Sequence, residues 1–282
     1  MRIFDPHIHM TSRTTDDYER MAAAGVRALV EPAFWLGQPR TNPGSFTDYF
    51  DSLIGWEPFR ASQFGIRHHA AIALNPKEAN DPRCREVLAL LPRYLAKDGV
   101  VAVGEVGYDS MTPDEDDVFA AQLALAVEHE LPALVHTPHR DKARGTARTL
   151  DVVRESGIDP GRVVLDHLNE TTVGLVRDTG CWLGFSIYPE TKMSPPRMVR
   201  ILREYGLERM VVNSAADWGR SDPLLTRVTA DAMRADGFTE DDVDRVLWRN
   251  PVEFYGQSGR LDLAFVEAQG TFAGNSILRG GN

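Results

Sequence analysis

The length, composition and charge of this chain limit the classes of protein to which it can belong. It has 282 residues, of which 43% are hydrophobic and 26% charged, so it is long enough to bury one large globular core. Its formal net charge of -10 at pH 7 argues against extensive binding to nucleic acid or anionic lipid, because those surfaces repel an acidic protein. A local phosphate pocket is still compatible with this charge, since cations within a site dominate its field.

Cysteine usage and the apolar segments indicate a cytoplasmic protein without a membrane partner. The two cysteines, Cys84 and Cys181, belong to no CxxC pair, so a disulfide framework is not expected. The first residues enter the fold without a long apolar segment. No apolar run reaches the roughly 18 residues that a membrane-spanning helix needs.

Short apolar runs alternate with amphipathic segments along almost the whole chain. The apolar runs are rich in Val, Ile, Leu and Ala without strict polar alternation, which is typical of strands buried on both faces. We expect these strands near residues 2–8, 26–34, 66–74, 100–106, 132–137, 162–167, 181–187 and 209–214. The helical patterns between them lie near residues 15–24, 46–63, 84–97, 115–129, 145–156, 170–178, 195–205 and 222–236. Eight such alternations predict an α/β fold, a parallel (β/α)₈ TIM barrel.

Helix-start signals and the composition of the C-terminal residues suggest the domain organisation. Residues 14–17, Thr-Thr-Asp-Asp, are typical of a helix start. Thr239 and the three acidic residues after it begin a closing helix at 239–255, which would cover one end of the barrel. We therefore expect a single metallohydrolase barrel domain over 1–263. The remaining residues, 264–282, end in Gly, Asn and other small residues and should form a peripheral or disordered tail.

Two features could shape a pocket at the active face of this barrel. The stretch 35–46, with Gly37 and Pro39, is a long loop after the second predicted strand, and such loops border the active face. It is either a substrate lid or a solvated connector, and the sequence leaves both open. Most of the tryptophans are expected in the core or in helix packing, but Trp218 adjoins a candidate site residue and could wall the pocket.

His7 and His9 form an HxH pair at the end of the first predicted strand. Because side chains alternate along a strand, both imidazoles would point into the barrel interior, where they can bind a divalent metal ion. The alternative is a pair of polar strand-end histidines with hydrogen-bond partners. Asp5, two residues earlier on the same face, could orient one imidazole.

Glu105 follows the apolar run 100–104, so its side chain should be buried. An ionised carboxylate there needs a cation or a hydrogen-bonding partner, because unpaired burial is costly. One solution is a ligand that bridges metal ions, and the other is a salt bridge to an arginine or lysine of the barrel. Gly104 and Gly107 favour close backbone packing at the end of this strand, which suits a site.

Three further polar residues follow apolar strands, and catalytic groups recur at this location in barrels. They are His136, His167 and Asp217. A single histidine there is more often a satisfied core residue, but two such histidines beside the HxH pair and Glu105 favour a metal site. Asp217 could ligate a metal and accept a proton from bound water. The alternative is that Asp217 caps the turn before Pro223.

Together these residues resemble the TatD family of metal-dependent hydrolases, within the wider amidohydrolase-like barrels. The resemblance covers most of residues 1–255 and is most specific over 104–109, Gly-Glu-Val-Gly-Tyr-Asp. The other residues that carry it, at the spacing of the family, are Phe119, Gln122, Leu123, Leu131, Pro132, His136, Asn250 and Phe254.

This resemblance implies a cofactor and a set of ligands. The family uses divalent cations, and several of its members cleave the phosphodiester bonds of nucleic acids. Carried over to this chain, the resemblance implies that one metal is held by His7, His9 and Asp217 and a second by His136 and His167, with Glu105 bridging them.

The chain departs from the family pattern in three places on the substrate side. Asn75 stands where the family usually has a histidine, and Thr-Pro-His-Arg-Asp at 137–141 replaces its Ser-Arg-Asp-Ala. At 213–217 the chain has Asn-Ser-Ala-Ala-Asp in place of a Glu-Thr-Asp segment. We expect Asn75, His139 and Arg140 to bind substrate, Arg140 being suited to a phosphate or carboxylate. For His139 and Arg140 the alternative is a solvated loop.

These observations predict a divalent-metal-dependent hydrolase with one or two ions, Zn²⁺ first and Mn²⁺, Ni²⁺ or Mg²⁺ as alternatives. A metal-bound hydroxide would attack a phosphoester or related bond of a small or nucleotide-like substrate. Glu105 and Asp217 would be the catalytic residues, and Asp217 would pass the proton to the leaving group. Two alternatives remain, a lactonase or amidase on the same metal site and a non-catalytic metal-binding barrel acting as a pathway component. The oligomeric state is left open.

Overall fold

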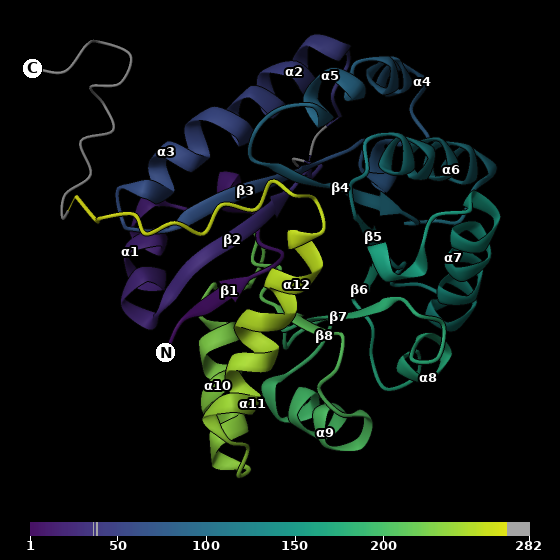
Figure 1. The fold of residues 1–282 in the computed structure, drawn as a ribbon. Coiled ribbons are helices and arrows are strands. Elements are labelled where there is room, and N and C mark those ends of the chain that lie inside the picture. The colour runs from purple at the N-terminus through teal and green to yellow at the C-terminus, as the bar shows by residue number, and fades with distance from the viewer. Residues whose placement is uncertain (36, 38, 270–282) are drawn as a thin grey trace, which may run out of the picture.

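The computed structural model describes residues 1–35, 37 and 39–269, and within them eight parallel strands curl into a barrel (Figure 1). The strands pair in chain order, from β1 with β2 to β7 with β8. This arrangement confirms the predicted (β/α)₈ TIM barrel. The strands are β1 Ile3–Asp5, β2 Val26–Pro32, β3 Arg67–Ile72, β4 Val100–Gly107, β5 Ala133–His136, β6 Val163–Asp166, β7 Trp182–Ser186 and β8 Met210–Asn213.

The ring closes between its first and last strands through hydrogen bonds just beyond β1 and β8. The N–H of Ala215 donates to the carbonyl oxygen of His7 over 2.9 Å, and the N–H of His9 donates to that of Ala216 over 2.9 Å. The seam of the barrel therefore lies beside the HxH pair.

Helices follow the strands and surround the barrel (Figure 1). Within the described residues, none is long and apolar enough to cross a lipid bilayer. The α-helices are α1 Thr15–Ala24, α2 Pro43–Asp51, α3 Glu57–Ser62, α4 Pro82–Arg85, α5 Leu91–Leu95, α6 Pro113–Glu128, α7 Lys142–Ser156, α8 Val173–Val176, α9 Pro195–Tyr205, α10 Leu225–Ala235, α11 Glu240–Asp244 and α12 Asn250–Gly256. Short 3₁₀ segments are η1 Met10–Ser12, η3 Pro76–Glu78, η4 Glu86–Ala89 and η5 Pro160–Arg162.

Two of the longer predicted helices contain a π-helical segment, and a third is divided. The π segments are η2 Ser52–Trp56, between α2 and α3, and η6 Arg245–Arg249, between α11 and α12. The helices expected at 46–63 and 239–255 are thus continuous helical stretches. The one expected at 84–97 is divided into α4, η4 and α5, because Pro92 has no N–H to donate and sits in the first turn of α5.

One end of the barrel is closed by α12. Strand residues such as Phe4, Val30 and Val101 fill the interior and pack with Phe254 and Tyr255 of this helix. The rings of Phe4 and Tyr255 stack with their centroids 5.9 Å apart. Figure 1 shows α12 lying across the strands at this end, as expected for the closing helix. The metal-ligand candidates lie at the opposite end, where the carboxyl ends of the strands meet.

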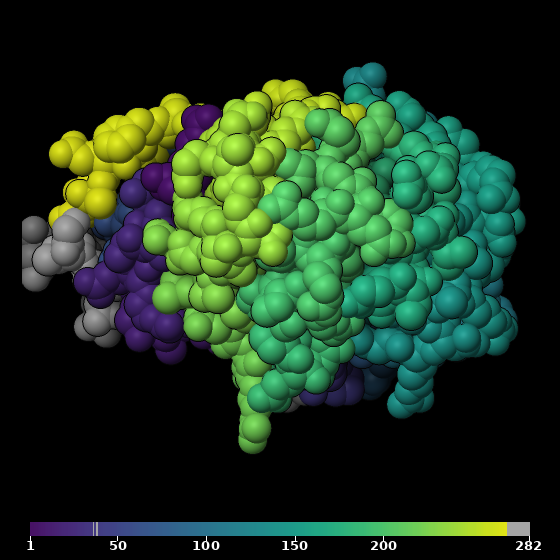
Figure 2. All heavy atoms as spheres, turned by 90° about the horizontal axis from the view of Figure 1, so that it is seen from below, coloured from purple at the N-terminus to yellow at the C-terminus, as the bar shows by residue number. Residues whose placement is uncertain are grey.

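The described part of the C-terminal segment runs from α12 along β3 and α3. Arg67 Nε donates to the carbonyl oxygen of Ala264 over 2.7 Å, and the N–H of Gln269 donates to that of Gln63 over 2.9 Å. Arg2 lines the same small pocket as residues 263–266 of this segment, and Figure 2 shows the described part of the segment beside the first residues of the chain. The tail expected at 264–282 thus makes contacts over its first residues, and 270–282 lie outside the described residues. The domain boundary at 263 stays a prediction.

Close packing of β4 against β5 should make glycine necessary at the end of β4. Gly107 has a φ of +119°, and a Cβ placed on it would lie 2.4 Å from the carbonyl oxygen of His136. We expect Gly107→Ala to lower the free energy of unfolding by about 2–4 kcal/mol, because strand backbone must shift. Urea denaturation followed by circular dichroism measures this change.

The matched control is Gly174→Ala in α8, where a Cβ would have nothing within 4 Å. This substitution should leave stability unchanged or raise it by up to about 1 kcal/mol, because alanine favours the helix. Equal unfolding midpoints for the two variants would contradict the close-packing argument.

Candidate metal centre

Four imidazoles and one carboxylate meet at the carboxyl ends of four strands. His7 and His9 directly follow β1, Glu105 lies near the end of β4, His136 ends β5 and His167 follows β6. All five side chains are buried. The sequence placed each of them at a strand end, and parallel strands end on one rim of a barrel. The structure brings these five predicted ligands together.

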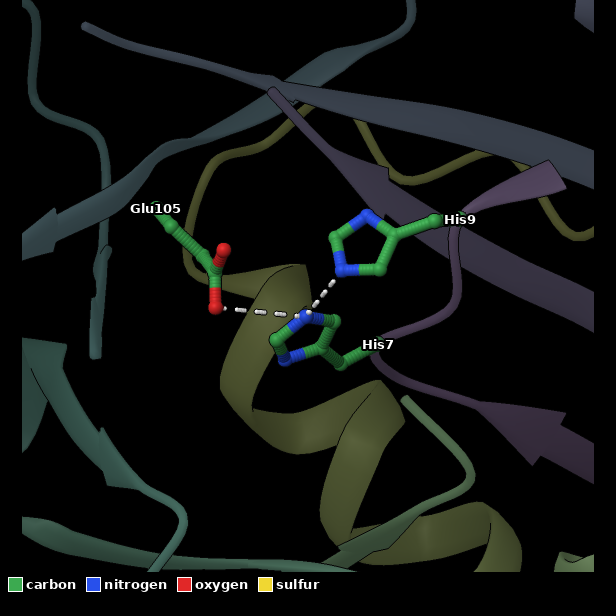
Figure 3. A group of neighbouring side chains, drawn as sticks. All are labelled: His7, His9 and Glu105. Carbon is green, nitrogen blue, oxygen red and sulfur yellow. Dashed lines mark hydrogen bonds and ion pairs between the residues drawn. The ribbon is translucent and has the colours of Figure 1, made fainter. Parts of the chain in front are cut away.

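Glu105 lies at the centre of this group. Its Oε1 is 3.4 Å from His7 Nε2, 3.3 Å from His136 Nδ1 and 3.3 Å from His167 Nε2. His7 Nε2 also lies 3.1 Å from His9 Nε2, so the first three ligand candidates converge on one point (Figure 3). Two groups whose ligand atoms lie within 4.8 Å of one another therefore share Glu105, one with His7 and His9 and one with His136 and His167.

The spacing and charge of these atoms fit divalent cations. Ligand atoms about 2.1 Å from a tetrahedral Zn²⁺ lie about 3.4 Å apart, close to the separations observed here. Burial opposes ionisation of Glu105, yet the charge of His7 and hydrogen bonds from His136 and His167 hold its pKa well below the usual value. Burial, together with the charge of His7, lowers the pKa of His9 well below its usual value. A divalent cation would bind the ionised carboxylate together with the imidazoles in their neutral form, so the proton of His7 would be lost when an ion binds.

A second layer of polar groups orients the imidazoles. Asp166 Oδ2 lies 2.6 Å from His7 Nδ1 and also accepts from Asn213 Nδ2 over 2.9 Å. Ser186 Oγ lies 2.7 Å from His167 Nδ1. These contacts leave the Nε2 atoms of His7 and His167 to face Glu105. Burial opposes the charge of Asp166, but His167 and the hydrogen bond from His7 lower its pKa below the usual range.

Sequence reasoning assigned the orienting role to Asp5 and missed Asp166, Ser186 and Asn213. Asp5 instead holds the backbone at the seam, since its Oδ1 accepts from the N–H of His7 over 3.3 Å and from that of Ser214 over 3.2 Å. The sequence does contain a signal for the missed residues, because each is a polar residue that ends an otherwise apolar strand.

The structure places Asp217 in the pocket but outside the ligand groups. Its Oδ1 accepts from the N–H of Gly219 over 2.7 Å and lies 3.2 Å from the hydroxyl of Tyr188. These bonds agree with the alternative that it caps its own turn. Ala215, two residues earlier with a φ of +42°, lines the same pocket.

Of the three residues expected to bind substrate, two line the pocket and one does not. Asn75 lines the pocket, and its Nδ2 donates to Glu105 Oε2 over 3.0 Å. His139 also lines the pocket, although it is exposed, and partial desolvation with the charge of Lys192 lowers its pKa to about 3. Arg140 is exposed and does not line the pocket.

Lys192, in the loop after β7, is a pocket residue that sequence reasoning missed. Among the described residues its ammonium group makes no ion pair, and its Nζ lies 5.4 Å from the centroid of the Tyr188 ring. The backbone N–H of Lys192 donates to the carbonyl oxygen of Tyr188 over 2.8 Å. Burial lowers the pKa of Lys192, and the carboxylates of Glu105 and Asp166 partly oppose that change. A lone lysine in a loop carries no periodic signal, so only the folded loop shows that it lines the pocket.

A further His–Glu group lies under the loop that follows β1, but its carboxylates are already bonded. It consists of Glu31, Glu57 and His68. Glu31 accepts from the N–H of Thr11 over 2.7 Å and faces His68 Nε2 at 2.9 Å. Glu57 accepts from Arg60 over 2.7 Å, and this guanidinium charge opposes an added cation. These bonds fit a structural role for His68.

Comparison with known proteins places this geometry in a family. The family model described as TatD related DNase matches residues 4–256. A protein of Methanocaldococcus jannaschii, described as an uncharacterized metal-dependent hydrolase, is 28% identical over 254 residues, which cover 90% of this chain and 99% of the relative. A putative deoxyribonuclease of Danio rerio is 25% identical, with 90% of this chain and 97% of the relative covered.

Solved structures share the fold. A TatD-like protein of Archaeoglobus fulgidus is 26% identical with a TM-score of 0.75, and the match covers 89% of this chain and 99% of that one. The phosphotriesterase homology protein of Escherichia coli, complexed with phosphate in its active site, is 17% identical with a TM-score of 0.67 over 90% of this chain and 98% of its own. This second likeness concerns the fold alone. The family match from β1 to α12, with these relatives, shows that the chain belongs to the TatD family, as its motifs indicated.

Proposed function

We propose that this protein is a divalent-metal-dependent hydrolase that cleaves a phosphoester or related bond in a small or nucleotide-like substrate. The observation that carries the proposal is the position of Glu105 Oε1, within 3.4 Å of imidazole nitrogens from β1, β5 and β6. This centre lies at the base of a pocket of about 240 Å³, large enough to admit a small substrate. The names of the relatives as metal-dependent hydrolases support the same activity.

In this proposal the metal ions are held from two sides of Glu105. His7 and His9 would hold one ion, His136 and His167 the other, and Glu105 would contact both. Zn²⁺ suits this imidazole-rich donor set, and Mn²⁺, Ni²⁺ or Mg²⁺ are the alternatives. When bound, such ions polarise a substrate oxygen and lower the pKa of water from about 15.7 to about 7.

The side chains of the pocket supply the remaining functions. The ammonium group of Lys192 would neutralise an anionic oxygen of the substrate, since it has no carboxylate partner of its own among the described residues. Asn75 holds Glu105 in place through Oε2, leaving Oε1 to the centre. Asp217 lies on the pocket wall and would accept a proton at a carboxylate oxygen and return it to the leaving group.

Removal of the central carboxylate charge tests the metal centre. We expect Glu105→Gln to lose most of its bound metal and its turnover with retained secondary structure, because it removes the charge of the ligand shared by both groups. His136→Ala should also lose metal and turnover, because it removes a ligand of one group. Metal content by mass spectrometry, circular dichroism and parallel assays on phosphodiesters, lactones and amides measure this. Glu19→Gln, on the exposed side of α1, is the control. Full metal content and turnover in both variants would refute the ligand set. Turnover of lactones or amides alone would replace the phosphoester assignment.

Asp166 should influence the metal without contacting it. Asp166→Asn removes the charge that holds His7 Nδ1 but keeps the shape of the side chain. We expect metal affinity to fall about 10- to 100-fold, as when the partner of a ligating histidine is removed. Titration calorimetry of chelator-treated protein with Zn²⁺ measures the affinity. Asp178→Asn, whose side chain is 87% exposed, should bind like the wild type, and an unchanged affinity in Asp166→Asn would remove Asp166 from this role.

The charge of Lys192 should favour anionic substrates. We expect Lys192→Met to lower kcat/KM for an anionic phosphodiester about 10- to 100-fold, the loss typical of one charged hydrogen bond, with a much smaller effect on a neutral lactone. Lys192→Arg should recover part of the activity because it restores the charge. Equal losses on the charged and neutral substrates would show that Lys192 acts on the fold of its loop instead.

A further inference from the structure

A row of aromatic rings leads from the metal centre to the mouth of the pocket. The rings of His9 and Phe34 stack with centroids 3.8 Å apart and planes 17° apart. Phe34 contacts Trp218 at 4.7 Å, and Trp218 meets Trp35 edge-on at 5.4 Å and 75°. Phe34 and Trp35 come from the loop after β2 and Trp218 from the loop after β8. The two sides of the pocket mouth therefore meet through aromatic contacts.

The outer rings of this row are open to solvent. Phe34 is buried, whereas Trp218 is 48% exposed and Trp35 half-buried, and both tryptophans line the pocket. The turn that carries Trp218 is held by other groups, since the N–H of Gly219 donates to Asp217 Oδ1 and the N–H of Asp217 donates to Ser221 Oγ over 2.9 Å. The indole is thus not needed to hold its own turn. An exposed apolar surface at a pocket mouth is typical of ligand binding.

Two lysine side chains line the same pocket as these rings. Lys77 Nζ lies 5.3 Å from the Trp35 ring and pairs with Asp109 at 2.5 Å, while Lys192 lines the same pocket without an ion pair among the described residues. A ligand at this mouth would meet flat apolar faces on one side and an ammonium group nearer to the imidazoles.

We propose that Trp35 and Trp218 form a stacking site that selects substrates with a planar ring attached directly to the bond that is cleaved. This inference rests on the proposed function, and it adds the substrate class. Because Phe34 alone separates Trp218 from His9, the ring and the reacting group belong to one small molecule. Aryl and heteroaryl esters meet this requirement, whereas purely alkyl esters leave the indoles in water.

Binding of two phosphonates separates this inference from the hydrolase assignment. We expect phenylphosphonate to bind the wild-type protein about 5- to 100-fold more tightly than methylphosphonate, the range typical of one ring stacked on an aromatic side chain. Both affinities are measured by titration calorimetry on metal-loaded protein, with quenching of tryptophan fluorescence as a second readout. Neither measurement requires turnover. Equal affinities, or no binding of phenylphosphonate, would overturn the stacking site even in an active hydrolase.

Variants locate the site. Trp218→Ala should abolish the preference for phenylphosphonate and leave methylphosphonate binding and metal content unchanged, while Trp218→Phe should keep most of the preference. Phe265→Ala, which removes an aromatic ring that is 87% exposed on the C-terminal segment, is the matched control. A preference that survives in Trp218→Ala would overturn the proposal.

Kinetics test the same selection. With a phenyl ester and an alkyl ester of the same phosphate, Trp218→Ala should raise KM for the phenyl ester with little change in kcat. An equal rise in KM for the alkyl ester would contradict selection for rings. If no substrate is turned over by any variant but the phosphonate preference depends on Trp218, the proposed function fails and the stacking site stands.

Discussion

The ionised carboxylate of Glu105, buried among imidazoles, is the constraint on which the rest of the site depends. An isolated charge would cost many kcal/mol in such surroundings, so every neighbour must compensate it. Imidazoles from three strands face one of its oxygens and Asn75 donates to the other. A shift of any of these strands by one residue would turn its ligand to the opposite face, so the register of the barrel and the chemistry of its rim are fixed together.

The fold and the inner ligands could be predicted because they follow from short-range patterns. Buried parallel strands are nearly continuous apolar runs, and the residue that ends each run must lie on the same rim. His7, Glu105, His136 and His167 obey this rule, and the structure gathers them. Their convergence follows from topology alone. The family resemblance agreed with this expectation at the same residues.

The substrate side could not be predicted in the same way, because its residues lie on loops whose paths depend on contacts between distant segments. Asp217 is directed by the hydroxyl of Tyr188 and by its own turn, and Arg140 is exposed even though His139, its neighbour, lines the pocket. Lys192 lines the pocket from a loop that folds back on Tyr188, whose carbonyl oxygen accepts from the N–H of Lys192. No periodicity in the sequence encodes such contacts, so the sequence does not show that His139 lines the pocket while the adjacent Arg140, equally exposed, does not.

The seam of the barrel has a consequence for assembly of the molecule. The backbone groups of His7 and His9 that complete the ring bond to residues 215 and 216, more than two hundred positions later in the chain. The ligand pair at the start of the chain therefore stays without its final support until the last strand has been synthesised and docked. An ion coordinated there would tie the start of the chain to Glu105 of β4, so metal binding and completion of the barrel would each favour the other.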